Sequence, residues 1–132
     1  MAWERTDQAF FAAGACHVLA WVCRDSYPER SIQTAAVRFA GERQVCHVYA
    51  IWEGWAFDHS GWHPEPQLLA VNTEFEGQPL ERVEITVGLA EFCEQHHSRM
   101  PHQYWQDPLP RAREYVGRHV PPWASRPRPS MP

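Results

Sequence analysis

Two turn signals divide the first half of the chain into three short apolar segments, and this pattern constrains the fold more than any other feature. Residues 32–40 are rich in β-branched and apolar side chains and end at the turn sequence Gly41-Glu42-Arg43. Residues 44–52 and 55–59 flank Glu53-Gly54, which suits a two-residue hairpin turn. The sequence therefore predicts an antiparallel sheet that includes a tight hairpin.

The sequence on either side of this region has helical spacing. Counting from Cys16, the apolar positions Leu19, Ala20 and Cys23 repeat at i+3, i+4 and i+7. This spacing predicts a helix that starts near Cys16, ends before Pro28 and turns the thiol toward its packing partner. Apolar spacing predicts further helices over residues 64–75, 89–97 and 109–119, and alternation predicts a strand over residues 81–87.

These elements predict a single α+β domain over residues 1–120. Its N-terminal helix carries Cys16 and packs on an antiparallel sheet of about four strands, with helices after the hairpin and at the C-terminus. A chain of 132 residues buries a sufficient core as one domain. Residues 121–132 contain five prolines together with Ser and Arg, and we expect them to form a flexible tail.

Charge and cysteine content restrict the environment of the protein. The formal net charge of −4 and the lack of a basic stripe argue against nucleic acid as a partner. The apolar stretch 8–23 is too short to span a bilayer, and the acidic Glu4 and Asp7 before it do not suit a signal peptide. The four cysteines are widely spaced, which indicates reduced thiols and a cytoplasmic location. Delivery by a specialised secretion system would leave no sequence signal of this kind.

The hairpin register brings two polar side chains together. With Glu53 and Gly54 as the turn, Tyr49 faces Asp58, and His47 becomes the diagonal neighbour of Asp58 on the same face. Diagonal Cβ atoms lie on the order of 7 Å apart, which an imidazole and a carboxylate can bridge. If the helix of Cys16 packs across this hairpin, its N-terminus lowers the pKa of the thiol.

These three residues predict a catalytic triad. Cys16 is the candidate nucleophile, His47 the general base and Asp58 the residue that orients the imidazole. The backbone amide of Cys16 and the side chain of Gln8 are candidate oxyanion donors. The indoles of Trp52, Trp55 and Trp62 are candidates for the walls of a substrate groove.

The segments that carry the triad also resemble a known family. Gly14-Ala15-Cys16-His17-Val18-Leu19-Ala20, His47-Val48-Tyr49 and Gly54-Trp55-Ala56-Phe57-Asp58 resemble the papain-like fold of the transglutaminase and bacterial toxin-deamidase type. The resemblance covers residues 14–60. It implies a cysteine that attacks the carbonyl of a protein or peptide amide to give a thioester, without a metal or organic cofactor. Deamidation of glutamine or proteolysis is the implied outcome, and the resemblance leaves the oligomeric state unknown.

Three other interpretations use some of the same residues. In the first, the chain is a non-catalytic binding or adaptor module with an exposed patch of Trp52, Trp55 and Trp62. A second is a zinc site, whose candidate ligands are Cys93, His96, His97 and His102. The third pairs Cys46 with His59, which are also diagonal neighbours on the predicted hairpin.

Overall fold

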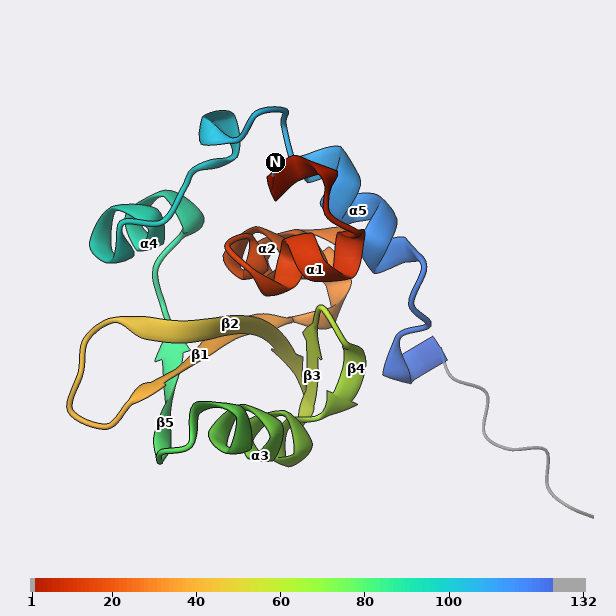
Figure 1. Ribbon diagram of the computed structural model, residues 1–132. Helices are drawn as coiled ribbons and strands as arrows, with labels where there is room; N and C mark the ends of the chain where they lie inside the picture. The colour runs from red at the N-terminus through yellow and green to blue at the C-terminus, as the bar shows by residue number, and fades with distance from the viewer. Residues whose placement is uncertain (1, 125–132) are drawn as a thin grey trace, which may run out of the picture.

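The computed structural model describes residues 2–124 and has the predicted α+β class (Figure 1). Helices cover both faces of one five-stranded antiparallel sheet, whose strand order is β4-β3-β2-β1-β5. The strands are β1 (Gln33–Phe39), β2 (Val45–Trp52), β3 (Trp55–Asp58), β4 (Gly61–Pro64) and β5 (Leu80–Ile85). The α-helices are α1 (Asp7–Ala12), α2 (Cys16–Ser26), α3 (Glu65–Glu76), α4 (Leu89–His96) and α5 (Leu109–Gly117). Four single turns of 3₁₀ helix are η1 (Ala2–Glu4), η2 (Pro28–Arg30), η3 (Pro101–Gln103) and η4 (Pro122–Ala124).

The hairpin between β2 and β3 has the register that the sequence predicts. Ala50 lies opposite Phe57, and Trp52 lies opposite Trp55 across the two-residue turn. Glu53 and Gly54 both have positive φ, at 42° and 82°, as the tightest hairpin turns require. Because a slip of one residue would exchange the two faces of the strand, this turn decides which side chains share a face.

One extra residue enters β2 beside the candidate base. Val37 of β1 lies opposite His47, but Arg38 lies opposite Val45, so Cys46 is the additional residue of a β-bulge. Bulges re-aim the side chains around them. Cys46 is therefore outside the regular alternation on which its predicted pairing with His59 depends.

The short strand β4 is a difference from the prediction. Its four residues pair with β3, so that Phe57 lies opposite Trp62. The sequence predicts no strand between residues 59 and 81, because four residues that finish in proline carry little strand signal. Gly61 has a φ of 89°, and a Cβ there would lie 3.0 Å from the ring of His119. The turn into β4 therefore depends on a glycine.

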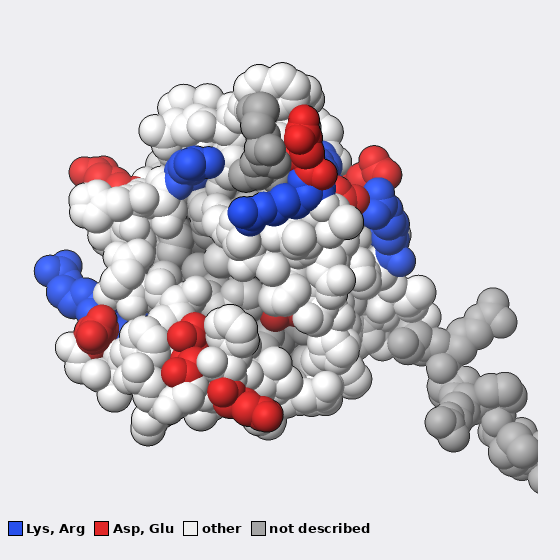
Figure 2. Space-filling view, viewed as in Figure 1, with Lys and Arg blue, Asp and Glu red and all other residues white. Residues whose placement is uncertain are grey.

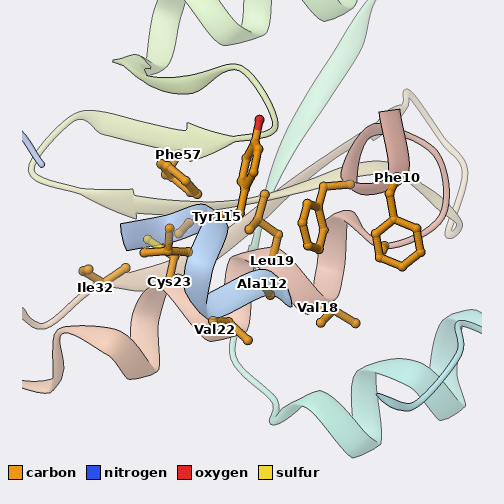
Figure 3. Close-up of a cluster of buried hydrophobic side chains, with 13 residues drawn as sticks. Phe10, Val18, Leu19, Val22, Cys23, Ile32, Phe57, Ala112 and Tyr115 are labelled. Carbon is orange, nitrogen blue, oxygen red and sulfur yellow. The ribbon is translucent and has the colours of Figure 1, made fainter. Parts of the chain in front are cut away.

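The helices α2 and α3 cover opposite faces of the sheet. Figure 3 shows side chains of α2 packed against Phe57 of the sheet, with Phe10 of α1 and Tyr115 of α5 in the same cluster. On the other face, Leu68 of α3 packs on Val37, Tyr49 and other sheet residues. The alternating side chains of β2 thus divide, with Val48 and Ala50 on the side of α2 and Tyr49 on the side of α3.

The helices described are short. The longest, α3, has 12 residues. Crossing a bilayer takes about 20 apolar residues. Within residues 2–124 no helix has the length and apolar character for such a crossing.

The folded domain extends beyond the predicted boundary at residue 120. Trp123 in η4 makes edge contacts with Tyr27, Trp52 and Trp62, with ring centroids 4.8, 5.0 and 5.6 Å apart. Residues 121–124, which were expected in the flexible tail, therefore belong to the domain. The high proline content predicts a flexible tail, but it takes no account of the Trp123 indole, which packs into an aromatic cluster. The rest of the predicted tail, residues 125–132, lies outside the described part of the chain.

Candidate active site

Cys16 is the first residue of α2, at the positive end of the helix. Ala15 is the N-cap and provides no side-chain cap, so the first amides of the helix are available to other acceptors. Gly14 before it has a φ of 110°, and its carbonyl accepts a 2.7 Å hydrogen bond from the hydroxyl of Tyr104. The half-buried thiol therefore lies at a helix N-terminus, where negative charge is favoured.

His47 and Asp58 form a buried hydrogen bond between neighbouring strands. Nε2 of His47 donates to Oδ2 of Asp58 at 2.9 Å, and both side chains are more than nine-tenths buried. The other carboxylate oxygen, Oδ1, accepts the backbone N–H of Ser60 at 2.8 Å. Both oxygens of Asp58 thus face donors, which fixes the carboxylate and leaves Nδ1 of His47 for a second partner.

Cys16 lines a cavity together with His47, although α2 packs on the opposite face from Tyr49. His47 lines two cavities, one of about 580 Å³ with Cys16 and one of about 520 Å³ with Asp58. Strand β3 ends at Asp58 and pairs only with Ala50, Ile51 and Trp52 of β2, so the earlier part of β2, which includes His47, has no partner residue in β3. The imidazole therefore lies at a stretch of β2 that β3 does not cover, where it hydrogen-bonds Asp58 and interacts electrostatically with the Cys16 thiol.

The charged form of this pair is favoured. Burial by itself raises the pKa of the Cys16 thiol, but hydrogen bonds and charge interactions with His17 and His47 outweigh it and lower the pKa to about 6. Burial likewise opposes a charge on His47, whereas Asp58 and Cys16 raise its pKa to about 10. Between these two values the pair exists as a thiolate and an imidazolium.

The other three cysteines lack these partners. Burial raises the pKa of Cys23 and of Cys93. The pKa of Cys46 is also raised, first by burial and then by the carboxylate of Glu76. Cys16 is therefore the cysteine with thiolate character, and the alternative in which Cys46 is activated by His59 is not supported by the charges around it.

A third histidine lies beside the carboxylate. Nδ1 of His59 is 3.8 Å from Oδ2 of Asp58, and the His59 and His47 rings are 5.5 Å apart. Burial lowers the pKa of His59 in spite of the carboxylate of Asp58. Its buried Nδ1 has no hydrogen-bond partner in the part of the chain that the structure describes. His59 is therefore a neutral neighbour of the triad.

The potential ligand atoms of His47, Asp58 and His59 lie within 4.8 Å of one another. Two imidazoles and a carboxylate at this spacing could bind a metal ion. Two of these atoms already form the 2.9 Å hydrogen bond of the triad, so a metal ion would have to replace that bond. Among residues 2–124, no other group of three or more His, Cys, Asp or Glu side chains comes close enough together to hold a metal ion. Cys93, His96, His97 and His102 are not brought together, and the predicted zinc alternative is corrected accordingly.

The structure also corrects the candidate groove residues. Gln8 is exposed on α1 and does not line the cavity of Cys16, so it is not placed as an oxyanion donor. Trp52 and Trp62 pack around Trp123 against the main core, away from both cavities of His47. Trp55 is 39% exposed at the hairpin turn. Of the three indoles in the binding-module alternative, Trp55 is thus exposed, whereas Trp52 and Trp62 are partly buried.

Sequence reasoning missed the residues on the other side of the sulfur. His17 is 4% exposed, its Nε2 donates to the carbonyl of Arg99 at 2.7 Å, and it helps to lower the pKa of the neighbouring Cys16. A histidine inside an otherwise apolar run was the available signal. The partner of His17 lies more than 80 residues away in the chain, and short-range spacing does not report such contacts.

Comparison of the chain with protein-family models, curated proteins and solved structures gave no match. The chemistry of the site therefore rests on its own geometry. A thiolate at a helix N-terminus, an imidazolium beside it and a carboxylate behind the imidazolium together suit nucleophilic attack on a carbonyl carbon.

Proposed function

We propose that the protein is a cysteine-dependent amide hydrolase of the papain-like type, acting on a protein or peptide as a glutamine deamidase or a protease. The observation that carries the proposal is the convergence of Cys16, His47 and Asp58, with the 2.9 Å His47–Asp58 hydrogen bond and a thiol pKa of about 6. These residues come from one helix and two strands, so their meeting is a property of the tertiary fold.

In the first half of the reaction, the thiolate of Cys16 attacks the amide carbon. A C–S bond forms, and the carbonyl π electrons move to the oxygen, where the free amide of Cys16 is available to donate to the oxyanion. Nδ1–H of the His47 imidazolium then protonates the leaving nitrogen as the C–N bond breaks. Ammonia or an amine departs, and the acyl group remains on sulfur as a thioester.

In the second half, water takes the position of the departed amine. Neutral His47 accepts a proton from the water as its oxygen attacks the thioester, and the C–S bond breaks to regenerate the thiolate and the imidazolium. Asp58 keeps the Nε2–H tautomer throughout, because its carboxylate accepts that proton in a hydrogen bond at 2.9 Å. A glutamine side chain would be converted to glutamate with release of ammonia, and a peptide bond would be cleaved to give two fragments.

A panel of glutamine-containing peptides, followed by mass spectrometry, tests the proposal. We expect conversion of a side-chain carboxamide to a carboxylate, or cleavage into two fragments, in at least one sequence context. Added hydroxylamine should divert the reaction to a hydroxamate, because it intercepts a thioester. A protein in which Cys16 is rapidly alkylated, but which gives neither product nor hydroxamate across peptides and folded protein substrates, would contradict the proposed activity.

A further inference from the structure

The cavity beside Cys16 has a charge opposite to that of the whole chain. The chain carries a formal net charge of −4, yet the cavity lining includes Arg5 and Arg99 and contains no Asp or Glu. Figure 2 shows Arg side chains in the upper half of this face, with some Asp and Glu side chains beside them, and further acidic side chains over α3 at its lower edge. The lining of the cavity itself therefore carries basic side chains without acidic ones.

Both arginines have charge available for a ligand. Arg5 and Arg99 are exposed, and no ion pair joins either guanidinium to a carboxylate among residues 2–124. Other arginines are neutralised: Arg111 and Arg118 pair with Asp7 at 2.6 and 2.8 Å. The remaining basic groups of the lining are histidines, of which His96 has a pKa lowered by burial and by nearby arginines. Apart from the His47 imidazolium, which is paired with the Cys16 thiolate, the two arginines therefore supply the positive charge of the cavity.

The contacts of Arg99 hold its segment next to the nucleophile. Its carbonyl accepts hydrogen bonds from His17 at 2.7 Å and from Sγ of Cys93 at 3.5 Å. Its guanidinium lies 5.7 Å from the centre of the Tyr104 ring, and the hydroxyl of Tyr104 is bonded to Gly14. The backbone of Arg99 is therefore fixed to His17, next to Cys16, while its side chain is exposed in the lining of the cavity.

Arg5 belongs to a different segment of the cavity lining. Its carbonyl accepts a 2.6 Å hydrogen bond from Arg111, and Thr6, the next residue, caps α1 through a 3.2 Å bond to the amide of Ala9. The cavity is thus bordered by two cations from segments more than 90 positions apart in the chain. The two guanidinium groups attract a negatively charged substrate toward the cavity that holds the sulfur.

We propose that the Cys16 cavity selects acidic peptide segments, with Arg5 and Arg99 binding carboxylates that flank the amide under attack. This selectivity rests on the proposed hydrolase function, but it is a property of the cavity and can be measured without turnover. Arg5 and Arg99 are specificity residues in this proposal, and they act through charge at the cavity mouth.

Alkylation with charged and neutral reagents tests the charge selection. The rate ratio of iodoacetate to iodoacetamide at Cys16 should exceed the same ratio for a small free thiolate by about fivefold at low salt. The excess should shrink as salt is added, because ions screen exposed charges. Arg5→Ala and Arg99→Ala should each lower the ratio by about twofold to threefold, and the double variant should lower it further.

Arg113→Ala is the matched control for these variants. Arg113 is exposed on α5 and does not line the cavity, so its removal changes the net charge equally and should leave the ratio unchanged. An equal fall in all three single variants would show that net charge alone acts, and it would overturn the proposal. The same conclusion follows if the wild-type ratio equals that of the free thiolate. Neither result depends on amide hydrolysis.

Protection by peptides identifies the source of the anion. A glutamine peptide flanked by glutamates should protect Cys16 from iodoacetamide at a concentration at least about tenfold below that needed for the same peptide flanked by lysines. Protection should weaken in the Arg5→Ala, Arg99→Ala double variant. Equal protection by both peptides would overturn the proposal, as would inorganic phosphate protecting better than the acidic peptide.

Discussion

Replacing Cys16 by alanine should lower amide hydrolysis by at least about a thousandfold, to the background rate, and leave the fold intact. No other group in the cavity replaces the thiolate, because the remaining cysteines have raised pKa values. The substitution removes one sulfur atom from the first turn of α2, where alanine is well tolerated. Hydrolysis by the variant is measured with the best glutamine peptide, and thermal unfolding is measured alongside it.

Cys46→Ala provides the control for this prediction. Cys46 also lines the cavity and is half-buried, but it belongs to the bulge in β2 and has no imidazole partner that lowers its pKa. Its replacement should keep hydrolysis within about twofold of wild type. If Cys16→Ala remains active, or if Cys46→Ala is the variant that loses activity, Cys16 is not the nucleophile.

Asp58→Asn should reduce hydrolysis by about a hundredfold while Cys16 remains in place. Asp58 accepts from Nε2–H of His47 through one oxygen and from the amide of Ser60 through the other. An asparagine side chain has a single acceptor oxygen, so it can satisfy only one of these two donors. Either His47 loses the partner that fixes its tautomer, or the Ser60 amide is left unpaired. In both cases the imidazolium loses the neighbouring negative charge.

The pH profile of the Asp58→Asn variant separates this effect from general damage. The carboxylate stabilises the protonated imidazole, so its loss should lower the pKa of His47 and raise that of Cys16. Glu65→Gln is the comparison, because Glu65 is another largely buried carboxylate that accepts from Tyr49 at 2.6 Å outside the triad. A similar loss of hydrolysis in both variants, with an unchanged profile in Asp58→Asn, would show that Asp58 has only a structural role.

The parts of the site that depend on short-range pattern could be predicted from the sequence. Glu53-Gly54 determined the hairpin register, and the register put His47 and Asp58 on one face. The helical spacing after Cys16 gave the position of α2, because apolar periodicity and a terminating proline define a helix well. The predicted geometry of the His47–Asp58 pair is confirmed by their 2.9 Å hydrogen bond, while its catalytic role stays a prediction.

The parts that depend on long-range packing could not be predicted in this way. Trp52 and Trp62 turn toward Trp123 because that indole returns from the end of the chain, and their exposure could not be judged without it. The segment around Arg99 lies beside the nucleophile through bonds to His17 and Cys93. Gln8 lies upstream of Cys16 in the sequence, but its side chain on α1 is exposed. Sequence proximity is a poor guide to neighbours across a cavity.

The pH dependence of thiol alkylation tests the central claim most directly, namely that Cys16 and His47 form a thiolate and imidazolium pair. Iodoacetamide labelling of Cys16, located by peptide mass spectrometry, should rise with a midpoint near pH 6, well below the ordinary thiol pKa of 9.0. His47→Ala should move the midpoint upward by more than about one unit, because the thiolate loses its cationic partner. A wild-type midpoint near the ordinary value, unchanged by His47→Ala, would contradict the account.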